Sequence, residues 1–295
     1  GELISYGLGG VASTSATQFR TSYAMNFMSD VAGLHVGAVG ILSTVMLIWD
    51  ACNDLIIGRI ADRTNTKRFG KYRPHMMMGI LLWAVVLLML FHVPSLPEAG
   101  MWVYYVAALF LFATFYTQFT VPWQALNSAM THDPQERNLL LTCRQYGGFI
   151  AGAVVGVITM PLVKHFADPR TGWTVSAVIV AVTMVITGLL SAHGARRVDY
   201  YNSLPTPEPT HLSGQLKIVF KNRAIICAAL LLGVVTLVNS CSSAVSLYYL
   251  GNVVGSVTLK SVFSLVSLGV SLVFIPAMPF LLRKLGKART VLLGM

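Results

Sequence analysis

Charged side chains are scarce in this chain of 295 residues, because Asp, Glu, Lys and Arg together make up only 11% of it. Soluble domains carry about 25% charged residues. Hydrophobic residues account for 55% of the sequence. A water-facing surface cannot be built from so few charges, so the composition excludes an ordinary soluble domain and indicates a protein surrounded by lipid.

Cysteine is also rare, and the few cysteines do not form a recognisable site. Cys52, Cys143, Cys227 and Cys241 form no CxxC pair and lie within apolar runs, where we expect them to be small packing residues. The chain shows no HExxH motif, Gly-rich phosphate loop or Ser/His/Asp arrangement. We therefore expect neither an enzyme nor a bound organic cofactor, and no large soluble module marks a structural subunit.

Long apolar runs, in contrast, fill most of the chain. A membrane-spanning helix needs roughly 20 such residues. The runs are continuous rather than alternating, which favours helices over barrel strands. The sequence predicts an all-α polytopic membrane protein, with a ninth span beginning near Thr290. Eight complete spans are expected at 3–28, 36–60, 74–93, 101–129, 138–166, 173–195, 224–249 and 258–282.

The net charge of +10 is concentrated in three loops. Of the 21 Lys and Arg residues, six lie in 59–73, five in 196–223 and four in 283–289, whereas the loop 94–100 has none. Basic residues gather in cytoplasmic loops of membrane proteins. This pattern indicates membrane topology rather than nucleic-acid binding, and it places the N-terminus on the cytoplasmic side of the membrane. We expect that membrane to be a bacterial inner membrane.

The spans divide into two groups. Residues 1–195 are expected to form an N-terminal six-helix bundle. The segment 196–223 has three prolines within five residues, which cannot lie in a bilayer helix, so we interpret it as a cytoplasmic linker. Residues 224–295 would then be part of a C-terminal bundle, contributing helices seven and eight and the start of helix nine.

A short internal repeat supports two related halves. The sequence FGKYRP at 69–74 is echoed by LGKART at 285–290, at an offset of 216 residues and after the second helix of each group. Parallel repeats of six helices are typical of one large transporter fold. A complete protein of this kind would have twelve helices, so we expect this chain to be a fragment.

The second predicted helix holds two buried acids. Asp50 and Asp54 are four residues apart and therefore lie about 40° apart on one helical face, with Asn53 beside them. Each ionised Asp at membrane depth costs roughly 2.5–3.5 kcal/mol. Coordination of a hard cation by these oxygens, or a proton held between the carboxylates, can offset this cost. A structural network with Lys or Arg on another helix is the alternative.

The end of the same helix contains a second pattern. Gly58, Asp62 and Arg63 resemble the G-x-x-x-D-R loop of major facilitator transporters. In that reading they form a charge lock between helices, which is broken and remade as the protein changes conformation. A plain solvated basic loop is the alternative.

Several motifs together resemble one transporter family. These are YGLGG at 6–10, WDACNDLIIGRIADRTNT at 49–66, FGKYRP at 69–74 and the region from FYTQFTVPWQALNSAM at 115–130 into TCRQYGG at 142–148. The chain resembles the glycoside–pentoside–hexuronide:cation symporters, which are melibiose permease-like members of the major facilitator superfamily. The resemblance implies a monomer in membrane lipid that carries a sugar together with a cation by alternating access.

The resemblance also implies a set of cation ligands. Asp50, Asn53 and Asp54 match the ligands on helix two, and Thr117 matches the helix-four hydroxyl that completes the site. The coupling ion implied is Na⁺ or H⁺, and Asn53 beside both acids favours Na⁺.

The sugar site departs from the melibiose permease pattern. There, carboxylates on helices one and four bond the sugar, whereas Thr14 and Thr120 stand at those positions here. Hydroxyls can still bond a sugar, but without charge assistance. The loss of these acids, together with an additional arginine at Arg20, makes an anionic glycoside such as a uronide worth testing. The candidate substrate residues are Thr14, Gln18, Arg20, Gln118, Thr120, Trp123 and Arg144.

Some of these residues have other readings. Arg20 can pair with Asp50 or Asp54, or extend to a membrane face. Trp123 can be a packing or interfacial residue. Because the sugar-binding acids are missing, a related carrier for a non-sugar solute, such as an organic anion or a lipid-like compound, is the alternative function.

Overall fold

The described part of the chain is helical. The computed structural model describes residues 2–64, 66, 70–131, 133–196, 222–254, 259, 262–263, 265–267 and 269–270. Over these residues the long elements are α1 (Glu2–Asn26), the π-helical turn η1 (Phe27–Val31), α2 (Val36–Arg63), α3 (Arg73–Leu90), α4 (Glu98–Met130), α5 (Pro134–His165), α6 (Pro169–Gly194) and α9 (Arg223–Asn252).

The predicted all-α fold is confirmed, and each of the first seven predicted spans coincides with a helix. Residues 197–221 of the predicted linker, most of the span 258–282 and Thr290 lie outside the described residues. A helix can cross a membrane when it is at least 18 residues long and holds an apolar window with few charges. Among the described residues, the helices that qualify are Arg73–Leu90, Glu98–Asn127, Glu136–His165 and Pro169–Gly194.

Proline and a capping aspartate set several helix boundaries. Pro97 immediately precedes α4, and Pro134 is the first residue of α5, where a missing N–H costs nothing. At the start of α6, the Asp168 carboxylate accepts hydrogen bonds of 3.2 Å from the backbone N–H groups of Arg170 and Thr171. These bonds satisfy two of the amides that a helix start leaves without partners.

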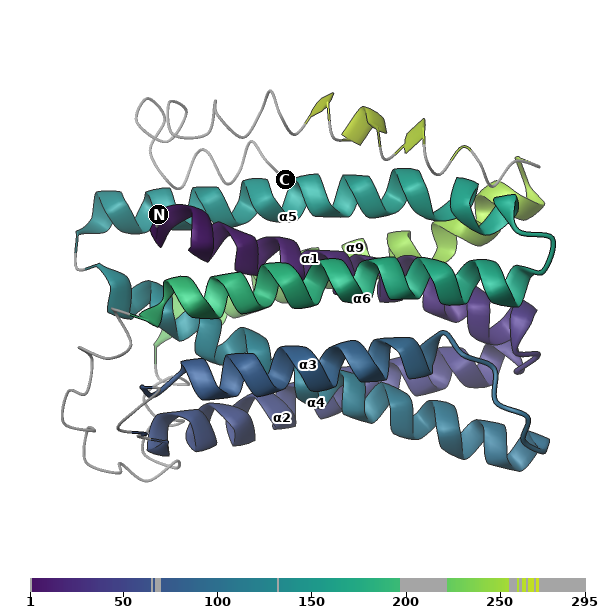
Figure 1. Ribbon diagram of the computed structural model, residues 1–295, viewed down its shortest axis with the longest axis horizontal. Helices are drawn as coiled ribbons and strands as arrows, with labels where there is room; N and C mark the ends of the chain where they lie inside the picture. Colours follow the sequence, from purple (N-terminus) through teal and green to yellow (C-terminus); the bar gives the residue numbers. More distant parts are fainter. Residues whose placement is uncertain are drawn as a thin grey trace.

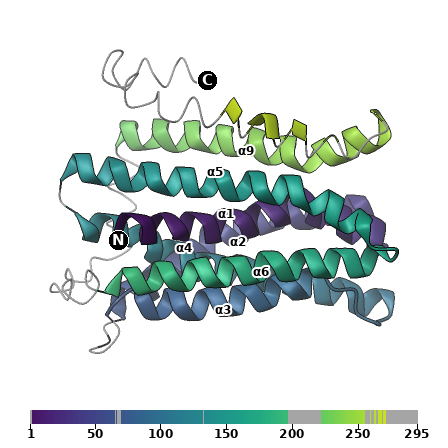
Figure 2. The ribbon, with the colours of Figure 1, turned by 45° about the horizontal axis from the view of Figure 1, so that its top comes forward.

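The helices run side by side along the long axis of the molecule (Figure 1). Helix α1 lies between α5 and α6, and it packs most extensively on these two helices. Helix α3 packs on α4 and α6, while α2 packs mainly on α4. Figure 2 shows α9 running along the same axis, and α9 contacts the bundle through α1.

Glycines allow α1 and α5 to approach closely. A Cβ atom on Gly10 would lie 2.5 Å from the backbone oxygen of Arg144, and one on Gly147 would lie 2.6 Å from the backbone oxygen of Gly7. Small residues at helix contacts are the usual means of close packing in membranes. The glycines of YGLGG and YGG therefore fix how α1 and α5 fit together.

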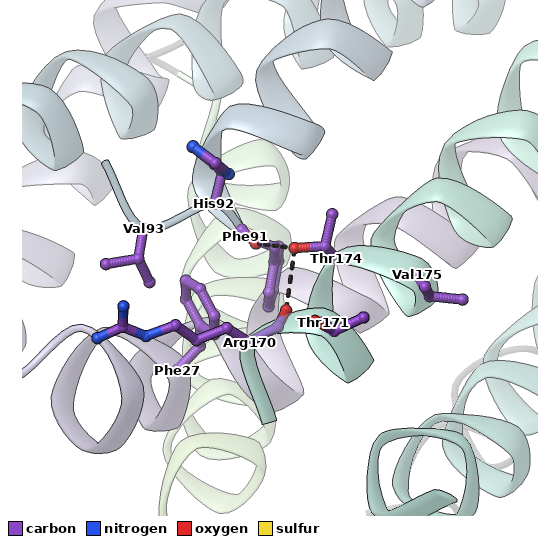
Figure 3. A pocket seen from close by; sticks show the side chains of 8 residues that line it. All are labelled: Phe27, Phe91, His92, Val93, Arg170, Thr171, Thr174 and Val175. Atoms are coloured by element: carbon purple, nitrogen blue, oxygen red, sulfur yellow. Dashed lines mark hydrogen bonds between the residues drawn. The ribbon is translucent and has the colours of Figure 1, made fainter. Parts of the chain in front are cut away.

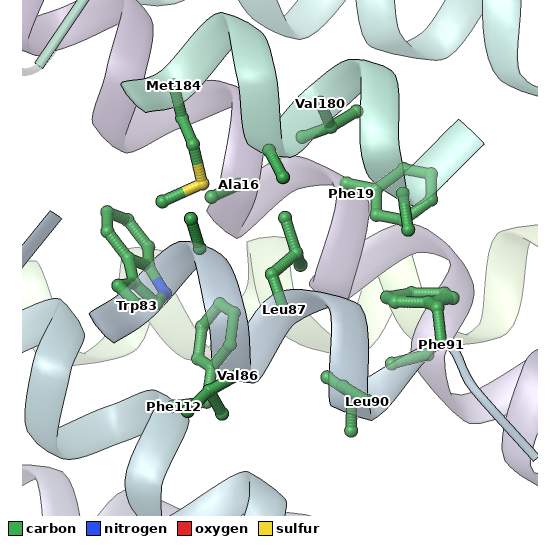
Figure 4. Packing of buried hydrophobic residues seen from close by; sticks show 14 of the residues in the cluster. Ala16, Phe19, Trp83, Val86, Leu87, Leu90, Phe91, Phe112, Val180 and Met184 are labelled. Carbon is green, nitrogen blue, oxygen red and sulfur yellow. The ribbon is translucent and has the colours of Figure 1, made fainter. Parts of the chain in front are cut away.

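The bundle has a buried aromatic and aliphatic core and an apolar exterior. Figure 4 shows part of the core, in which Phe19 of α1 and Phe91, at the end of α3, lie near side chains of α6. Large apolar side chains also cover the outside, for example Val103 at 70% exposure and Ile186 at 54%. An apolar exterior over long helices is what a lipid environment requires.

Candidate functional site

The polar residues of α2 face α4. The hydroxyl of Thr117 on α4 donates a hydrogen bond of 3.0 Å to Oδ1 of Asp54. One helical turn earlier on α4, the backbone oxygen of Ala113 accepts a hydrogen bond of 3.3 Å from Nδ2 of Asn53. Two neighbouring polar residues of α2 are thus joined to two positions of α4 that are four residues apart.

These contacts place the cluster between helices instead of on the lipid-facing side of α2. Asn53 is 2% exposed and Thr117 is fully buried. Asp54 is exposed as a residue, but its Oδ1 is held toward α4 by Thr117. The Oδ1 of Asp50, one turn earlier on α2, is buried and has no hydrogen-bond partner among the described residues. An unsatisfied buried carboxylate oxygen needs a counter-charge or a ligand.

The donor set suits a hard monovalent cation or a proton. Two carboxylates, the amide oxygen of Asn53 and the hydroxyl oxygen of Thr117 are all oxygen ligands. The nitrogen of the Asn53 amide is used in the bond to Ala113, so its oxygen is the group available to an ion. Among the described residues, no group of three His, Cys, Asp or Glu side chains could hold a metal ion. The cluster therefore differs from the sites of transition metals.

Arg20 approaches this cluster from α1. Its guanidinium carbon lies 5.1 Å from the centroid of the Phe112 ring, which neighbours the Asn53-bonded carbonyl of Ala113 on α4. Its Nε is buried and has no hydrogen-bond partner among the described residues. Among the described residues, Arg20 and Asp50 are the two charged side chains with a buried atom that lacks a hydrogen-bond partner. Of the readings open to Arg20, pairing with a helix-two acid is the one that these contacts favour.

Trp123 and Arg144 form a second group, toward the start of α1. Trp123 is 1% exposed, and its ring stacks on Tyr6 at a centroid distance of 5.2 Å. The guanidinium carbon of Arg144 lies 4.6 Å from the Trp123 ring centroid, within the range of a cation–π contact. In this conformation the Trp123 ring is enclosed by protein, so a sugar ring has no free face on which to stack.

The remaining substrate candidates are dispersed. Thr14 faces α5, because a Cβ on Gly148 would lie 2.7 Å from its Oγ1. The Nε2 of Gln18 donates to Ser22 at 3.0 Å, within α1. Gln118 and Thr120 are buried in α4, where the Thr120 hydroxyl donates to the carbonyl of Tyr116 at 3.0 Å. Among the described residues, hydrogen bonds join the cation candidates of α2 to α4 but do not join these four substrate candidates into one site.

The gating candidates lie at the end of α2. Gly58 faces α4, where a Cβ on it would meet Cγ1 of Val121 at 3.8 Å. Asp62 and the exposed Arg63 occupy the last turn of α2, and the side chain of Asp62 lies outside the described residues.

Two contacts nearby were not expected from the sequence. The buried Arg73 donates from Nε to the backbone oxygen of Ala192 on α6 at 2.8 Å. The ring of His75 contacts the hydroxyl of Thr64 at 2.8 Å, joining α3 to the residue that follows α2. These bonds fix the end of the bundle that holds the 59–73 loop.

A pocket of about 310 Å³ lies elsewhere, where the end of α3 meets the start of α6 (Figure 3). It contains none of the predicted site residues. Inside it, the Thr174 hydroxyl donates to backbone oxygens of Arg170 at 3.0 Å and Phe91 at 3.4 Å. Its lining residues are Phe27, Phe91, His92, Val93, Arg170, Thr171, Thr174 and Val175.

Comparison with known proteins shows the family to which the chain belongs. The family profile described as MFS/sugar transport protein matches residues 5–295. The chain is 29% identical to the isoprimeverose transporter of Lactiplantibacillus pentosus, over 100% of this chain and 61% of the relative. It is 26% identical to the uncharacterized symporter YjmB of Bacillus subtilis and 24% identical to the glucuronide carrier protein homolog of Escherichia coli, over 99% of this chain and 64% of each relative.

These values have two consequences. The chain spans less than two thirds of the length of these relatives, whose names describe transporters, carriers and symporters. The family profile, in turn, covers nearly the whole chain. The chain therefore belongs to the MFS/sugar transport protein family and is a multi-pass, all-α membrane protein of the melibiose permease-like branch of the major facilitator superfamily.

Proposed function

We propose that this chain provides the first helical bundle and the cation site of a sugar or glycoside symporter. The observation that supports the proposal best is the hydrogen bond from Thr117 to Asp54, with Asn53 and Asp50 on the adjoining surface of α2. Oxygen ligands from two helices are thereby gathered at membrane depth, where a cation offsets the cost of buried carboxylates.

The coupling mechanism follows from that cost. A cation bound at Asp50 and Asp54 neutralises buried negative charge and so shifts the population toward a conformation with higher sugar affinity. Coupling between the cation and the sugar is reciprocal, because each ligand must change the affinity of the protein for the other by the same factor. Sugar and cation then cross together as the two bundles move around a central site. The exposed flank of Asp54 would face that central cavity.

The substrate class is a sugar or glycoside, as the names of relatives suggest. Arg20 and Arg144 supply positive charge to the interior of the bundle, whereas threonines occupy positions 14 and 120. A glucuronide carries a carboxylate that an arginine can bind in a bidentate manner. An anionic glycoside is therefore the substrate to compare with neutral glycosides first.

A carrier of non-sugar organic anions is the second candidate, and the positive charge of Arg144 inside the bundle favours it. Comparing the uptake of simple carboxylates with that of uronides distinguishes the two candidates. Transport of carboxylates that lack a sugar ring, together with no transport of glycosides, would replace the sugar assignment.

Radiolabelled uptake by the intact protein tests the main proposal, with neutral glycosides and glucuronides supplied with and without a sodium gradient. Asp54→Asn is expected to abolish cation-stimulated uptake while the protein still inserts into the membrane. Asp30→Asn is the matched control, since Asp30 is exposed at the end of η1, away from α4. Undiminished stimulation in Asp54→Asn would remove Asp54 from the cation site.

A proton gradient in place of sodium decides which ion is coupled. We expect sodium to stimulate uptake more strongly, because a neutral amide such as Asn53 can ligate Na⁺ but has little affinity for a proton. Stimulation by a proton gradient alone would assign H⁺ as the coupling ion.

A further inference from the structure

Two buried polar atoms of opposite charge lack hydrogen bonds in neighbouring helices. They are Nε of Arg20 on α1 and Oδ1 of Asp50 on α2, and neither has a partner among the described residues. Buried polar groups without partners are uncommon, so two of them with complementary charge need one explanation. Pairing of the Arg20 guanidinium with the Asp50 carboxylate would account for both.

The position of Arg20 ties it to the cation cluster. Its guanidinium carbon is 5.1 Å from the centroid of Phe112, and the adjacent carbonyl of Ala113 holds Asn53. One turn further along α4, Thr117 holds Asp54. The stretch of α4 from Phe112 to Thr117 is therefore contacted by Arg20, Asn53 and Asp54. Arg20 borders the cluster on the side of α1.

Other roles for Arg20 agree less well with these contacts. Extension to a membrane face requires the guanidinium to reach water, whereas its Nε is buried and the group stands over a ring of α4. A substrate carboxylate is not needed to balance its charge, because Asp50 already supplies an anion.

We propose that Arg20 is a built-in counter-cation of Asp50 and that it limits the site to one monovalent ion; this inference rests on the proposed cation site. Asp50 and Asp54 contribute two negative charges and Arg20 one positive charge, so the ion-free cluster has a net charge of −1. One Na⁺ or one proton then makes it neutral. Arg20 is a fixed charge, because a guanidinium is not deprotonated in proteins.

In this arrangement Asp50 and Asp54 have different roles. In the proposed pairing the charge of Asp50 is balanced by Arg20, whereas Asp54 accepts a hydrogen bond from the neutral hydroxyl of Thr117. Asp54 is therefore the carboxylate with most of its charge available to the ion. The empty carrier retains one uncompensated charge instead of two, which lowers the cost of the conformational change without its cargo.

A double-mutant cycle in the intact protein, without any coupling ion, tests the pairing of Arg20 with Asp50. Arg20→Gln and Asp50→Asn are expected to lower the thermal stability of the detergent-solubilised protein, because each removes one partner of a buried charge pair. The double variant removes both charges and is expected to recover most of that loss, even where Arg20→Gln alone fails to fold. Additive losses in the double variant would overturn the proposal.

Sodium binding, measured by calorimetry on the purified protein, tests the consequence for the ion. Arg20→Gln is expected to tighten sodium binding by about tenfold or more, because it removes a unit positive charge from beside the site. Arg20→Lys, which keeps the charge, should bind sodium as the parent does. Unchanged or weaker binding in Arg20→Gln, or equal effects of the two variants, would show that Arg20 acts by packing alone.

The double variant gives the decisive comparison of binding. Asp50→Asn alone leaves Arg20 and Asp54 to cancel, so sodium binding should be lost, whereas Arg20→Gln with Asp50→Asn restores a net charge of −1 and should regain it in part. No recovery in the double variant would count against the counter-cation. Failure of the proposed function looks different, because the unaltered protein would then bind neither sodium nor a proton.

Discussion

The hydroxyl of Thr117 on α4 donates a hydrogen bond of 3.0 Å to Oδ1 of Asp54 on α2. The two residues are 63 positions apart in the chain, and they meet because α2 packs mainly on α4. A neutral hydroxyl satisfies only part of the hydrogen-bonding capacity of a carboxylate. The contact therefore orients Asp54 and leaves it able to bind a cation.

Removal of that hydroxyl is expected to weaken the binding of the coupling ion. Thr117→Val keeps the shape of the side chain but loses the oxygen ligand, so cation affinity should fall on the order of tenfold, as for loss of one hydrogen bond to a charged group. Thr117→Ser retains the hydroxyl and should stay near the parent value. The measurement is the cation concentration that gives half-maximal stimulation of uptake.

A matched control is Thr183→Val on α6. The hydroxyl of Thr183 bonds the carbonyl of Ile179 in its own helix, and the residue is exposed. An equal loss of cation affinity in Thr183→Val would indicate a general effect of replacing threonine, and the specific role of Thr117 would then be withdrawn.

Sequence patterns predicted the presence of the helices better than the residues at which they begin and end. The expected spans 101–129 and 138–166 correspond to α4 and α5, but these begin at Glu98 and Pro134. The reason is physical, since apolar runs mark the part of a helix that crosses lipid, whereas proline and polar residues at its start extend into water. The π-helical turn η1 has no such sequence signal, and its Phe27 packs on Phe91 and Trp173.

The acids of α2 were evident because two charges one turn apart in an apolar run are costly whatever surrounds them. Arg73 shows the opposite case. It lies in a basic loop that predicts topology, yet in the structure its side chain is buried and bonds the carbonyl of Ala192, 119 residues away. Every residue has a backbone carbonyl, so nothing in the sequence identifies this acceptor.

Close packing of α1 on α5 predicts a strong effect of one added methyl group. Gly10→Ala would place a Cβ 2.5 Å from the backbone oxygen of Arg144, and a backbone atom cannot move aside as a flexible side chain can. We expect a loss of about 1–3 kcal/mol in the free energy of unfolding, the usual cost of overpacking. Thermal unfolding of the purified protein measures it.

The control for this substitution is Gly40→Ala in α2. Among the described residues, no atom beyond its own stretch of helix lies within 4 Å of the position that its Cβ would take, so alanine should be tolerated and should gain about 0.5–1 kcal/mol from helix propensity. If Gly10→Ala were as stable as Gly40→Ala, the two helices would not be packed through these glycines.

The bond between Arg73 and Ala192 predicts a second stability effect. Arg73→Met removes a charged donor and leaves a buried carbonyl unsatisfied, which should cost about 1.5–3 kcal/mol. Arg73→Lys should lose less, because lysine keeps the charge but not the planar Nε–H group. Arg59→Met is the control, since Arg59 is exposed on α2. Equal unfolding temperatures for the Arg73 and Arg59 methionine variants would contradict this role.

The cap of α6 predicts how stability depends on pH in the acid range. Hydrogen bonds from Thr171 and from the backbone N–H of Arg170 lower the pKa of Asp168 from its ordinary value of 3.8. Because the folded-state pKa is depressed, the contribution of the ionised cap is complete above the unfolded value and is lost as the pH falls through the lower, folded value. Asp168→Asn keeps a capping oxygen that does not titrate, so its unfolding temperature should fall less steeply than that of the parent between about pH 5 and about pH 2. Asp133→Asn changes another exposed aspartate just before a helix and controls for a general loss of negative charge. If the unfolding temperatures of the parent and of Asp168→Asn fell in parallel as the pH is lowered, the cap would be excluded as a source of acid sensitivity.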